Sequence, residues 1–445
     1  MTSKFWNEAI ECISPEDQRR LEDERLRVQI AYNCRTSPFY AAKLADAGVK
    51  PEDIRSTADL PLIPFMEKSD IASSQAAGAF LGINQCAPLT EIVRVQATGG
   101  TSGSPMRIGL TRRDIEDYNE MGARASWTMG CRPGDIVFTC MNFSLYAGGL
   151  SDHLTFENLG SVTIPYSVGQ SERLLAMMAN IKEDVAIWAT PSYAVRLADV
   201  ARELGIEPRS VGLTKGYFSG EPGIQVPGYR ERIEETWGME AHDGYGTGEL
   251  GLHSGECEHR QGFHYGATGI VYTELINPDT TEVLKLEDGL IGEAVYTSLR
   301  RQAGPLQRMR SHDLMQVFTE PCRCGRTSFR FKVLGRSDDM FIVKGVNVFP
   351  QAVQASLIKL TPRLTGEYQI VIEKKPPIDY PVTIRVEVAN SVPQSERPAL
   401  IAETTHRVQT ENNFACRIEL VAQGGIVATD RKTRRVIRSY LPSVS

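Results

Sequence analysis

Between about residues 90 and 300, short apolar runs alternate with amphipathic segments. The apolar runs are rich in β-branched and aromatic residues, as in buried strands, whereas the amphipathic segments repeat apolar residues at helical spacing. Strands that alternate with helices predict an α/β domain built on a largely parallel sheet. The strand-like runs are EIVRV, DIVFTC, SVTIPYS, VAIWAT, KGYFSG and AVYTSL, and the helix-like segments are RRDIEDYNEMGARASWTMG, SERLLAMMANI, PSYAVRLADVARELGI and YRERIEETWG.

The regions on either side of this alternation follow other patterns. Residues 15–60 carry helical periodicity that breaks at Pro38 and Pro51, which predicts a helical N-terminal prelude. After residues 335–350 the order becomes helix, two strands, helix and strand, which predicts a small α+β domain. We place the boundary near Asp338, where polar, flexible residues separate the two patterns. The expected domains are residues 1–337 and 338–445.

Length and charge restrict the classes of function. A chain of 445 residues exceeds the usual size of one compact core, in agreement with more than one domain. Its net charge of −6 argues against general binding to nucleic acids or anionic membranes. The apolar stretches fall far short of a membrane span, and the N-terminal MTSKFWNEAIEC has no apolar signal core. We therefore expect a folded cytoplasmic protein with neither nucleic acid nor membrane as a partner.

A glycine-rich stretch, VQATGGTSGSPMRIGLT, begins at residue 95 and lies between two apolar runs. Glycines after a strand let backbone N–H groups converge on an anion, and the hydroxyls of Thr98, Thr101, Ser102 and Ser104 add donors. The stretch differs from the usual P-loop, because no Gly-Lys-Ser/Thr follows. Taken alone, it is equally compatible with a plain surface loop.

Further motifs along the chain favour an anion-binding loop over a plain surface loop. They are SLYAGGL, YFSGEPG, AHDGYGTGELG at 241–251, MRSHDL, and GRSDDMFIVKGVNVFP at 335–350. Together with the glycine-rich stretch they resemble the adenylate-forming superfamily, and within it the phenylacetate–CoA ligase family. The resemblance runs from SPFYAAKLADAGVKPEDI to RKTRRV, which is almost the whole chain. It implies a large N-terminal α/β domain of the adenylate-forming type, followed by a small mobile α+β C-terminal lid domain.

The resemblance also implies an activity. The chain would be an AMP-forming acid–CoA ligase that uses Mg²⁺, ATP and CoA. It would adenylate a carboxylic acid, release pyrophosphate, and transfer the acyl group to CoA, and the resemblance points to an aryl or arylacetic acid as the substrate. The segment that would form the acid pocket is Tyr146, Ala147, Gly148 and Gly149.

The nucleotide site is implied position by position. The loop that grips the phosphates would comprise Thr98, Gly99, Gly100, Thr101, Ser102, Gly103 and Ser104. The family usually carries a lysine where this chain has Ser104, so Mg²⁺ and other cations must carry more of the charge. Tyr245 would stack on adenine, and Glu249 would hold Mg²⁺, a hard-oxygen role that suits a carboxylate. Asp313 would accept hydrogen bonds from the ribose, beside Arg336. The rest of the base pocket would be Gly220, Glu221, Pro222, Asp243, Gly246 and Thr247.

The resemblance gives the C-terminal region the mobile roles. Lys432 would be the catalytic cation that offsets charge on the α-phosphate during adenylation. The alternative is that Lys432 belongs to a solvated basic face. Asp338 would be the hinge, and Lys344 and Gly345 would line the approach of the thiol. The basic face would comprise Arg431, Arg434, Arg435 and Arg438 together with Lys432.

Three of the nine cysteines fall in two short segments, GECEHRQGFHY and PCRCGRT. Cys322 and Cys324 are close enough to reach one ion, and Cys257 with a nearby histidine would complete a Cys₃His tetrahedron. The spacing of such sites in the resembling family selects His264, with His259 as the alternative. The bound ion would be a structural Zn²⁺. The other reading is free cysteines in a reduced cytosol.

Two rival functions stay open at this point. One is the same adenylation followed by transfer to an amine or a carrier-protein thiol. The other is a non-catalytic nucleotide-binding homologue, which Ser104 alone suggests. The non-catalytic reading conflicts with the presence of Glu249, Asp313 and Lys432, because a protein that only binds a nucleotide needs no mobile cation. The resemblance also suggests a homodimer, although no periodic apolar stripe marks an interface.

Overall fold

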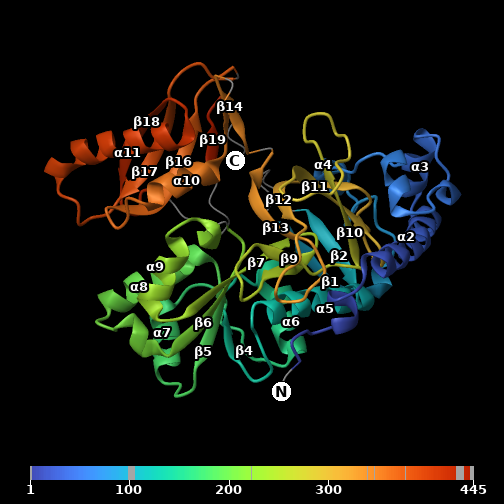
Figure 1. The fold of residues 1–445 in the computed structure, drawn as a ribbon, viewed down its shortest axis with the longest axis horizontal. Coiled ribbons are helices and arrows are strands. Elements are labelled where there is room, and N and C mark those ends of the chain that lie inside the picture. Colours follow the sequence, from blue (N-terminus) through green and yellow to red (C-terminus); the bar gives the residue numbers. More distant parts are fainter. Residues whose placement is uncertain are drawn as a thin grey trace. The chain divides into compact units, whose positions relative to one another are not determined.

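The computed structural model describes residues 3–98, 106–221, 223–337, 339–344, 346–375, 377–426 and 435–440, and Figure 1 shows its fold. The chain forms two compact units. The first contains Met1–Gly100, Ser104–Gly220 and Ile233–Val333, and the second contains Thr101–Gly103, Glu221–Arg232 and Leu334–Ser445. The predicted hinge at Asp338 lies outside the described residues, so its role stays a prediction.

A large mixed sheet organises the first unit. Among the described residues it has eleven strands in the order β10-β11-β12-β13-β9-β8-β7-β6-β5-β3-β4. The pairs β4–β3, β3–β5, β5–β6 and β6–β7 are parallel. The bounds are β3 Ile136–Thr139, β4 Val162–Ile164, β5 Val185–Ala189, β6 Leu213–Phe218, β7 Glu240–Thr247, β8 Gly251–Glu256, β9 Phe263–Tyr265, β10 Val271–Ile276, β11 Ile291–Ser298, β12 Met309–Phe318 and β13 Arg330–Arg336.

The prediction of a largely parallel sheet is right for the strands from β4 to β7 in the sheet order and wrong for the strands beyond β7. From β7 onward the pairs β7–β8, β8–β9, β10–β11 and β11–β12 are antiparallel. Short connections explain this, since a parallel pair needs a long crossover and an antiparallel pair does not. The run EIVRV does form a strand, β1 (Ile92–Ala97), but it pairs with β2 (Arg107–Thr111) in a separate two-stranded sheet.

The helices among the parallel strands begin where the sequence supplies caps. Thr111 accepts a hydrogen bond from the backbone N–H of Asp114 at the start of one helix. Thr190 does the same with Tyr193, and Pro191 occupies the first helical position after it. These helices are α5 Arg112–Thr128, α6 Asp152–Leu159, α7 Ser171–Ala179, α8 Pro191–Glu203 and α9 Tyr229–Trp237.

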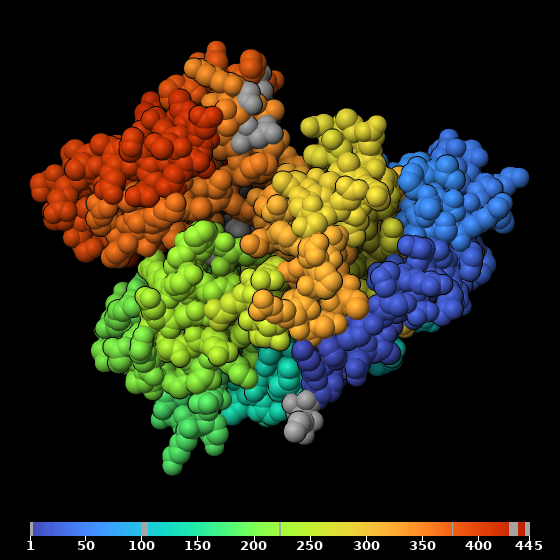
Figure 2. All heavy atoms as spheres, viewed as in Figure 1, coloured from blue at the N-terminus to red at the C-terminus, as the bar shows by residue number. Residues whose placement is uncertain are grey.

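The predicted helical prelude is confirmed. It consists of α1 (Glu8–Glu11), α2 (Pro15–Thr36) and α3 (Pro38–Asp46), and α4 (Lys68–Ala76) follows. Leu26, Ile30 and Leu44 pack in one buried cluster with Leu299. In Figure 2 the blue N-terminal residues accordingly lie against the yellow part of the chain. This packing fixes the start of α4 on the large sheet.

The second unit is the predicted small α+β domain. Its four strands are in the order β18-β17-β16-β19, and α10 (Pro350–Ile358) and α11 (Arg397–Asn412) share a core with them. A hairpin of β14 (Phe341–Val343) and β15 (Val346–Val348) precedes this sheet. The sheet strands are β16 Leu364–Ile372, β17 Val382–Val388, β18 Cys416–Ala422 and β19 Val436–Arg438. None of the helices described in either unit is long and apolar enough to cross a membrane.

Candidate active site

The carboxyl ends of the parallel strands carry most of the predicted site residues of the first unit. β3 leads into the segment that holds Tyr146, β6 leads to Gly220, and β7 contains Tyr245 near its end. In open α/β sheets this edge is where ligands bind. A β-carbon built on Gly220 would lie 3.7 Å from Thr190 and 4.0 Å from Met141, so the loops after β3, β5 and β6 meet here.

Tyr245 and Asp313, the residues predicted to contact adenine and ribose, are brought together. The hydroxyl of Tyr245 donates a hydrogen bond of 2.6 Å to Oδ2 of Asp313, which lies on β12. The Tyr245 ring packs edge-on against His253 and Phe331, with centroid distances of 5.2 and 5.3 Å. Burial and the nearby Asp313 carboxylate raise the pKa of Tyr245 well above its ordinary value, so its hydroxyl keeps its proton.

Glu249, the predicted magnesium ligand, is buried and paired with Lys68. Oε1 of Glu249 lies 2.7 Å from Nζ of Lys68. Burial raises the pKa of Glu249, but the Lys68 ammonium together with hydrogen bonds from the Glu249 main chain and the Thr247 side chain holds that pKa below its ordinary value. The backbone carbonyl of Glu249 accepts hydrogen bonds from the Tyr118 hydroxyl and from the Arg301 guanidinium. The carboxylate is therefore ionised and its main chain is fixed.

Lys68 was missed by the sequence analysis. It is the first residue of α4, where the helix dipole disfavours a cation. A lysine at this position indicates that an acidic group elsewhere compensates its charge. The sequence does not identify Glu249 as that group.

The two ends of the glycine-rich loop lie beside Glu249. The N–H of Thr98 donates a hydrogen bond of 3.0 Å to the carbonyl of Met106, which closes the base of the loop. A β-carbon on Gly248 would lie 3.0 Å from Cα of Thr98, and Met106 lines a pocket together with Glu249. The predicted residues Gly99, Gly100, Thr101, Ser102, Gly103, Ser104, Pro222, Asp338, Gly345 and Lys432 lie outside the described residues.

The predicted acid-pocket segment forms one turn of π-helix, Ala147–Ser151. A β-carbon on Gly149 would overlap the carbonyl oxygen of Asn142, so this position requires glycine. Gly148 has room, because its nearest neighbour would be Oδ2 of Asp152 at 3.7 Å. Its carbonyl accepts a 3.0 Å hydrogen bond from the Trp188 indole. The segment is tied to the loop through Ala97, whose N–H bonds to the carbonyl of Leu145, the residue before Tyr146.

Three further predicted residues lie on β7 itself. Asp243 is buried within the sheet. Gly246 has no room for a side chain, because a β-carbon there would overlap the carbonyl oxygen of Gly251. The buried hydroxyl oxygen of Thr247 lies close enough to Glu249 for its hydrogen bond to help lower the pKa of that carboxyl group.

The remaining predicted residues belong to the second unit. Glu221 begins its first described segment, Arg336 ends β13, and Lys344 is exposed in the β14–β15 turn with φ of +48°. Arg435 does not belong to a solvated basic face, because it forms a 2.7 Å ion pair with Glu367. Its guanidinium also lies over the ring of Tyr368, 4.7 Å from the centroid.

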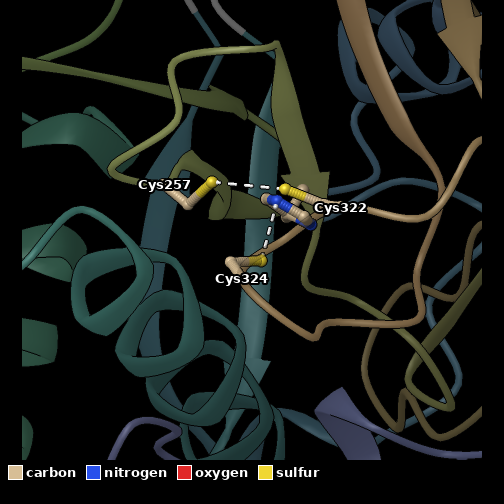
Figure 3. Close-up of side chains that lie close together, drawn as sticks. Cys257, Cys322 and Cys324 are labelled. Atoms are coloured by element: carbon tan, nitrogen blue, oxygen red, sulfur yellow. Dashed lines mark hydrogen bonds between the residues drawn. The ribbon is translucent and has the colours of Figure 1, made fainter.

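The cysteine cluster lies apart from these residues within the first unit. Figure 3 shows Cys257, Cys322 and Cys324 facing one another. The sulfurs of Cys257 and Cys322 are 3.7 Å apart, and that of Cys324 is 3.3 Å from Nε2 of His264. All four potential ligand atoms lie within 4.8 Å of one another, and all four residues are buried. His264, and not His259, completes the group, because the β8–β9 register sets His264 opposite Gly255, close to Cys257.

The loop that carries Cys322 and Cys324 also binds the N-terminal segment. Arg326 forms a buried ion pair of 2.7 Å with Glu11, and the N–H of Thr327 donates to the Glu11 carbonyl. The loop that carries Cys322 and Cys324 is therefore attached to α1, the first helix of the chain.

The class of protein follows from these features and from the small C-terminal unit. Residues 345–439 match the family of AMP-binding enzyme C-terminal domains. An α/β unit with a glycine-rich loop, an aromatic residue bonded to a carboxylate, and such a C-terminal domain defines an adenylate-forming enzyme.

Whole-chain comparisons narrow the class. The chain is 35% identical to phenylacetate–coenzyme A ligase of Thermus thermophilus over 408 residues, which cover 90% of this chain and 88% of that protein. It is 32% identical to the phenylacetate–coenzyme A ligase of Aromatoleum evansii, over 97% of this chain and 96% of the relative. A crystal structure of 2-hydroxyisobutyryl-CoA ligase with an acyl-AMP is 34% identical, with a TM-score of 0.89, and covers 98% of this chain and 92% of its own.

The chain therefore belongs to the phenylacetate–CoA ligase family. The predicted fold class and the predicted activity, an AMP-forming acid–CoA ligase that works through an acyl adenylate, are confirmed. Its substrates are accordingly a small carboxylic acid, ATP and CoA. The roles of the individual residues remain predictions.

Proposed function

We propose that this ligase activates an aryl or arylacetic acid in the segment around Tyr146–Gly149. The observation that supports the proposal is that a β-carbon on Gly148 would meet no atom closer than 3.7 Å, while the carbonyl of Gly148 is held by the Trp188 indole. The planar group of an aryl acid can use such room. The segment joins the phosphate loop through Ala97, so an acid bound there has its carboxylate near the nucleotide.

A branched hydroxy acid is the second candidate. The acyl-AMP in the similar structure of 2-hydroxyisobutyryl-CoA ligase is of that kind. In this chain Oδ2 of Asp152 would lie 3.7 Å from a β-carbon on Gly148, which would give a substrate hydroxyl a partner. An aryl acid requires room beside Gly148, whereas a hydroxy acid requires a polar partner there.

Pyrophosphate release from Mg·ATP separates the candidates. The assay would compare phenylacetate, benzoate, 2-hydroxyisobutyrate and acetate, each with and without CoA, and would detect the thioester product. The proposal expects release and thioester with an aryl or arylacetic acid at the lowest concentration. A preference for 2-hydroxyisobutyrate would overturn the aryl assignment, and release without a thioester would indicate an amine or carrier-protein acceptor.

For the nucleotide, Tyr245, Asp313 and Glu249 would bind the base, the ribose and Mg²⁺. Glu249 suits the ion, because its carboxylate is ionised and carboxylate oxygens are ligands that Mg²⁺ prefers. Magnesium would neutralise phosphate charge. From the second unit, Lys432 would approach the α-phosphate, Lys344 and Gly345 would line the path of CoA, and Asp338 would serve as the hinge.

The cysteine cluster would hold a structural zinc ion. Zn–S bonds of about 2.3 Å separate two thiolates of a tetrahedral site by about 3.8 Å, and the sulfurs of Cys257 and Cys322 are 3.7 Å apart. Three cysteines and His264 would fill all four positions, which leaves none for a substrate. The ion would stabilise the loop that holds the N-terminal segment through Arg326 and Glu11.

A further inference from the structure

The carboxyl group of Asp152 is buried beside the predicted acid-pocket segment. Asp152 is the first residue of α6, directly after the π-helical turn Ala147–Ser151, and it is 5% exposed. The N–H of Leu252 donates a 3.2 Å hydrogen bond to Oδ1 of Asp152. Within the part of the chain that the structure describes, Oδ2 has no hydrogen-bond partner. One oxygen of this buried carboxyl group is therefore left for water or for a ligand.

Asp152 differs from other buried acids of this unit, which are held in ion pairs. Glu274 is paired with Arg308 at 3.0 Å, and Glu293 is paired with Arg310 at 2.8 Å. Asp152 forms no ion pair with any described lysine, arginine or histidine. Burial instead raises its pKa from 3.8 to about 7, so a large share of it is uncharged near neutral pH. Neutralising a neighbouring cation is therefore not the role of this carboxyl group.

The room next to Oδ2 lies on the side of Gly148. Apart from the adjoining residues of the chain, Oδ2 of Asp152 is the one described atom within 4 Å of a β-carbon built on Gly148, at 3.7 Å. A β-carbon on Gly149 would instead overlap the carbonyl oxygen of Asn142, so the room is on one side of the segment. The free oxygen of Asp152 therefore faces the space in which the proposed function places the acid.

Ser151, the residue before Asp152, is hydrogen-bonded within the protein. Its hydroxyl donates to Oε1 of Gln96 at 2.8 Å and accepts from the Arg94 guanidinium at 3.2 Å. The Gln96 amide in turn donates to the carbonyl of Gly248 at 2.9 Å. Unlike Oδ2 of Asp152, these polar groups need no ligand to complete their hydrogen bonds. A polar substituent that enters beside the segment therefore finds its acceptor in Asp152.

We propose that Asp152 determines the specificity of the acid pocket by accepting a hydrogen bond from a hydroxyl or amino group of the substrate. This inference rests on the proposed function, which places the acid beside Gly148. The substrate is then an aryl or arylacetic acid that carries such a donor on its ring, because an unsubstituted ring leaves the buried oxygen without a partner. The alternative role of Asp152 is structural, in which it only holds β8 against α6 through Leu252.

A panel of acids distinguishes these roles. Pyrophosphate release from Mg·ATP would give kcat/KM for phenylacetate, benzoate, their hydroxyl and amino derivatives at the ortho, meta and para positions, and 2-hydroxyisobutyrate. In the wild type one ring derivative should exceed its parent acid by roughly tenfold or more, the effect of a hydrogen bond that a buried group otherwise lacks. Asp152→Ala should bring that derivative down to its parent acid and leave the parent almost unchanged. The derivatives that respond identify the donor as hydroxyl or amino.

Asp152→Asn provides a second test that does not depend on Asp152→Ala folding. It keeps an oxygen for the N–H of Leu252 and places an NH₂ donor where Oδ2 stands. The ratio of kcat/KM for the hydroxyl derivative to that for the methoxy derivative at the same ring position should fall, since a methoxy group accepts but does not donate. Glu157→Gln is the matched control, because Glu157 is an exposed residue of the same helix that pairs with His153 at 3.1 Å, and it should leave every ratio unchanged.

The outcomes also separate this proposal from the proposed function. A wild type that prefers the unsubstituted aryl acids, an advantage of a derivative that survives in Asp152→Ala, or equal losses for a derivative and its parent overturns the role of Asp152 and leaves the aryl assignment intact. A preference for 2-hydroxyisobutyrate that Asp152→Ala removes overturns the aryl assignment and retains Asp152 as the partner of a substrate hydroxyl. The absence of pyrophosphate release with every acid of the panel overturns both.

Discussion

The hydroxyl of Tyr245 donates a 2.6 Å hydrogen bond to Asp313 and so joins β7 to β12 at the edge of the sheet where the predicted nucleotide residues gather. This bond orients the carboxylate of Asp313 at the end of β7. It links two residues that the sequence analysis assigned separately to adenine and ribose.

Tyr245→Phe tests that link. The variant keeps the ring contacts with His253 and Phe331 but removes the donor to Asp313. We expect the KM for ATP to rise roughly tenfold or more, the usual effect of one lost hydrogen bond to a charged group, while the KM for the acid stays constant. Steady-state kinetics measure both constants. Tyr296→Phe is the control, since its hydroxyl is 3.2 Å from that of Tyr245; an equal rise there would contradict a specific role for the Asp313 bond.

Two adjacent glycines test the acid pocket. Gly148→Ala adds a methyl group where the nearest atom is 3.7 Å away, so we expect a stable protein that prefers smaller acids. Gly149→Ala forces a clash with the Asn142 carbonyl and should lower stability by about 2 kcal/mol or more. Thermal unfolding and a comparison of kcat/KM for phenylacetate and acetate measure these effects. An unchanged acid preference in Gly148→Ala would remove this segment from the acid pocket.

Metal content tests the cysteine cluster. The purified protein should contain about one zinc ion per chain, and Cys324→Ala should lose the ion and unfold at a lower temperature. Cys140→Ala, a change at another buried cysteine, should keep the ion. Because the ion would be structural, chelation should lower the melting temperature before it affects the KM for ATP. Full zinc content in Cys324→Ala would contradict the assigned ligand set.

Asp152 predicts a pH dependence of stability. Burial raises its pKa from 3.8 to about 7, with a backbone hydrogen bond from Leu252 acting against the shift. Between these values the unfolded chain has lost the proton that the folded chain keeps, so this group lowers stability as pH rises from about 4 to about 7. Asp152→Asn keeps an acceptor for Leu252 and removes the titration. Its gain over wild type should grow by on the order of 2 kcal/mol between about pH 5 and about pH 8.

Urea unfolding at the two pH values measures this difference. Asp199→Asn is the control, because Asp199 forms an exposed pair with Arg202 and its substitution should change stability little at either pH. A constant gain for Asp152→Asn across the range would show that its carboxyl group does not titrate there.

The accuracy of the sequence analysis depended on how local each signal was. Helices that start after Thr190-Pro191 or Ser14-Pro15 were predictable, because cap and proline are adjacent in the sequence. β8 escaped prediction, because its buried residues include His253 and Ser254 and give no apolar pattern. The second unit follows the predicted order of helix, two strands, helix and strand from α10 to β18, whereas the β14–β15 hairpin and β19 were not predicted.

The site residues also divide into those identified by local motifs and those whose contacts depend on the tertiary structure. Motifs identified Tyr245, Asp313 and Glu249, and the structure brings the first two into contact. The pairing of Lys68 with Glu249 could not be predicted, since it depends on residues 66–67 lying along β12. The resemblance had selected His264 over His259, and the strand register that sets His264 opposite Gly255 gives the structural reason for that choice.

The fixed main chain at Glu249 limits how this part of the enzyme can respond to a nucleotide. Tyr118 and Arg301 hold its carbonyl, so only the side chain can turn. An exchange of partners by the carboxylate then needs rotations about side-chain bonds, and the strand ends around it can stay where they are. Lys68 neutralises this carboxylate at 2.7 Å, so any rearrangement of the pair is confined to two side chains on strand ends that keep their positions.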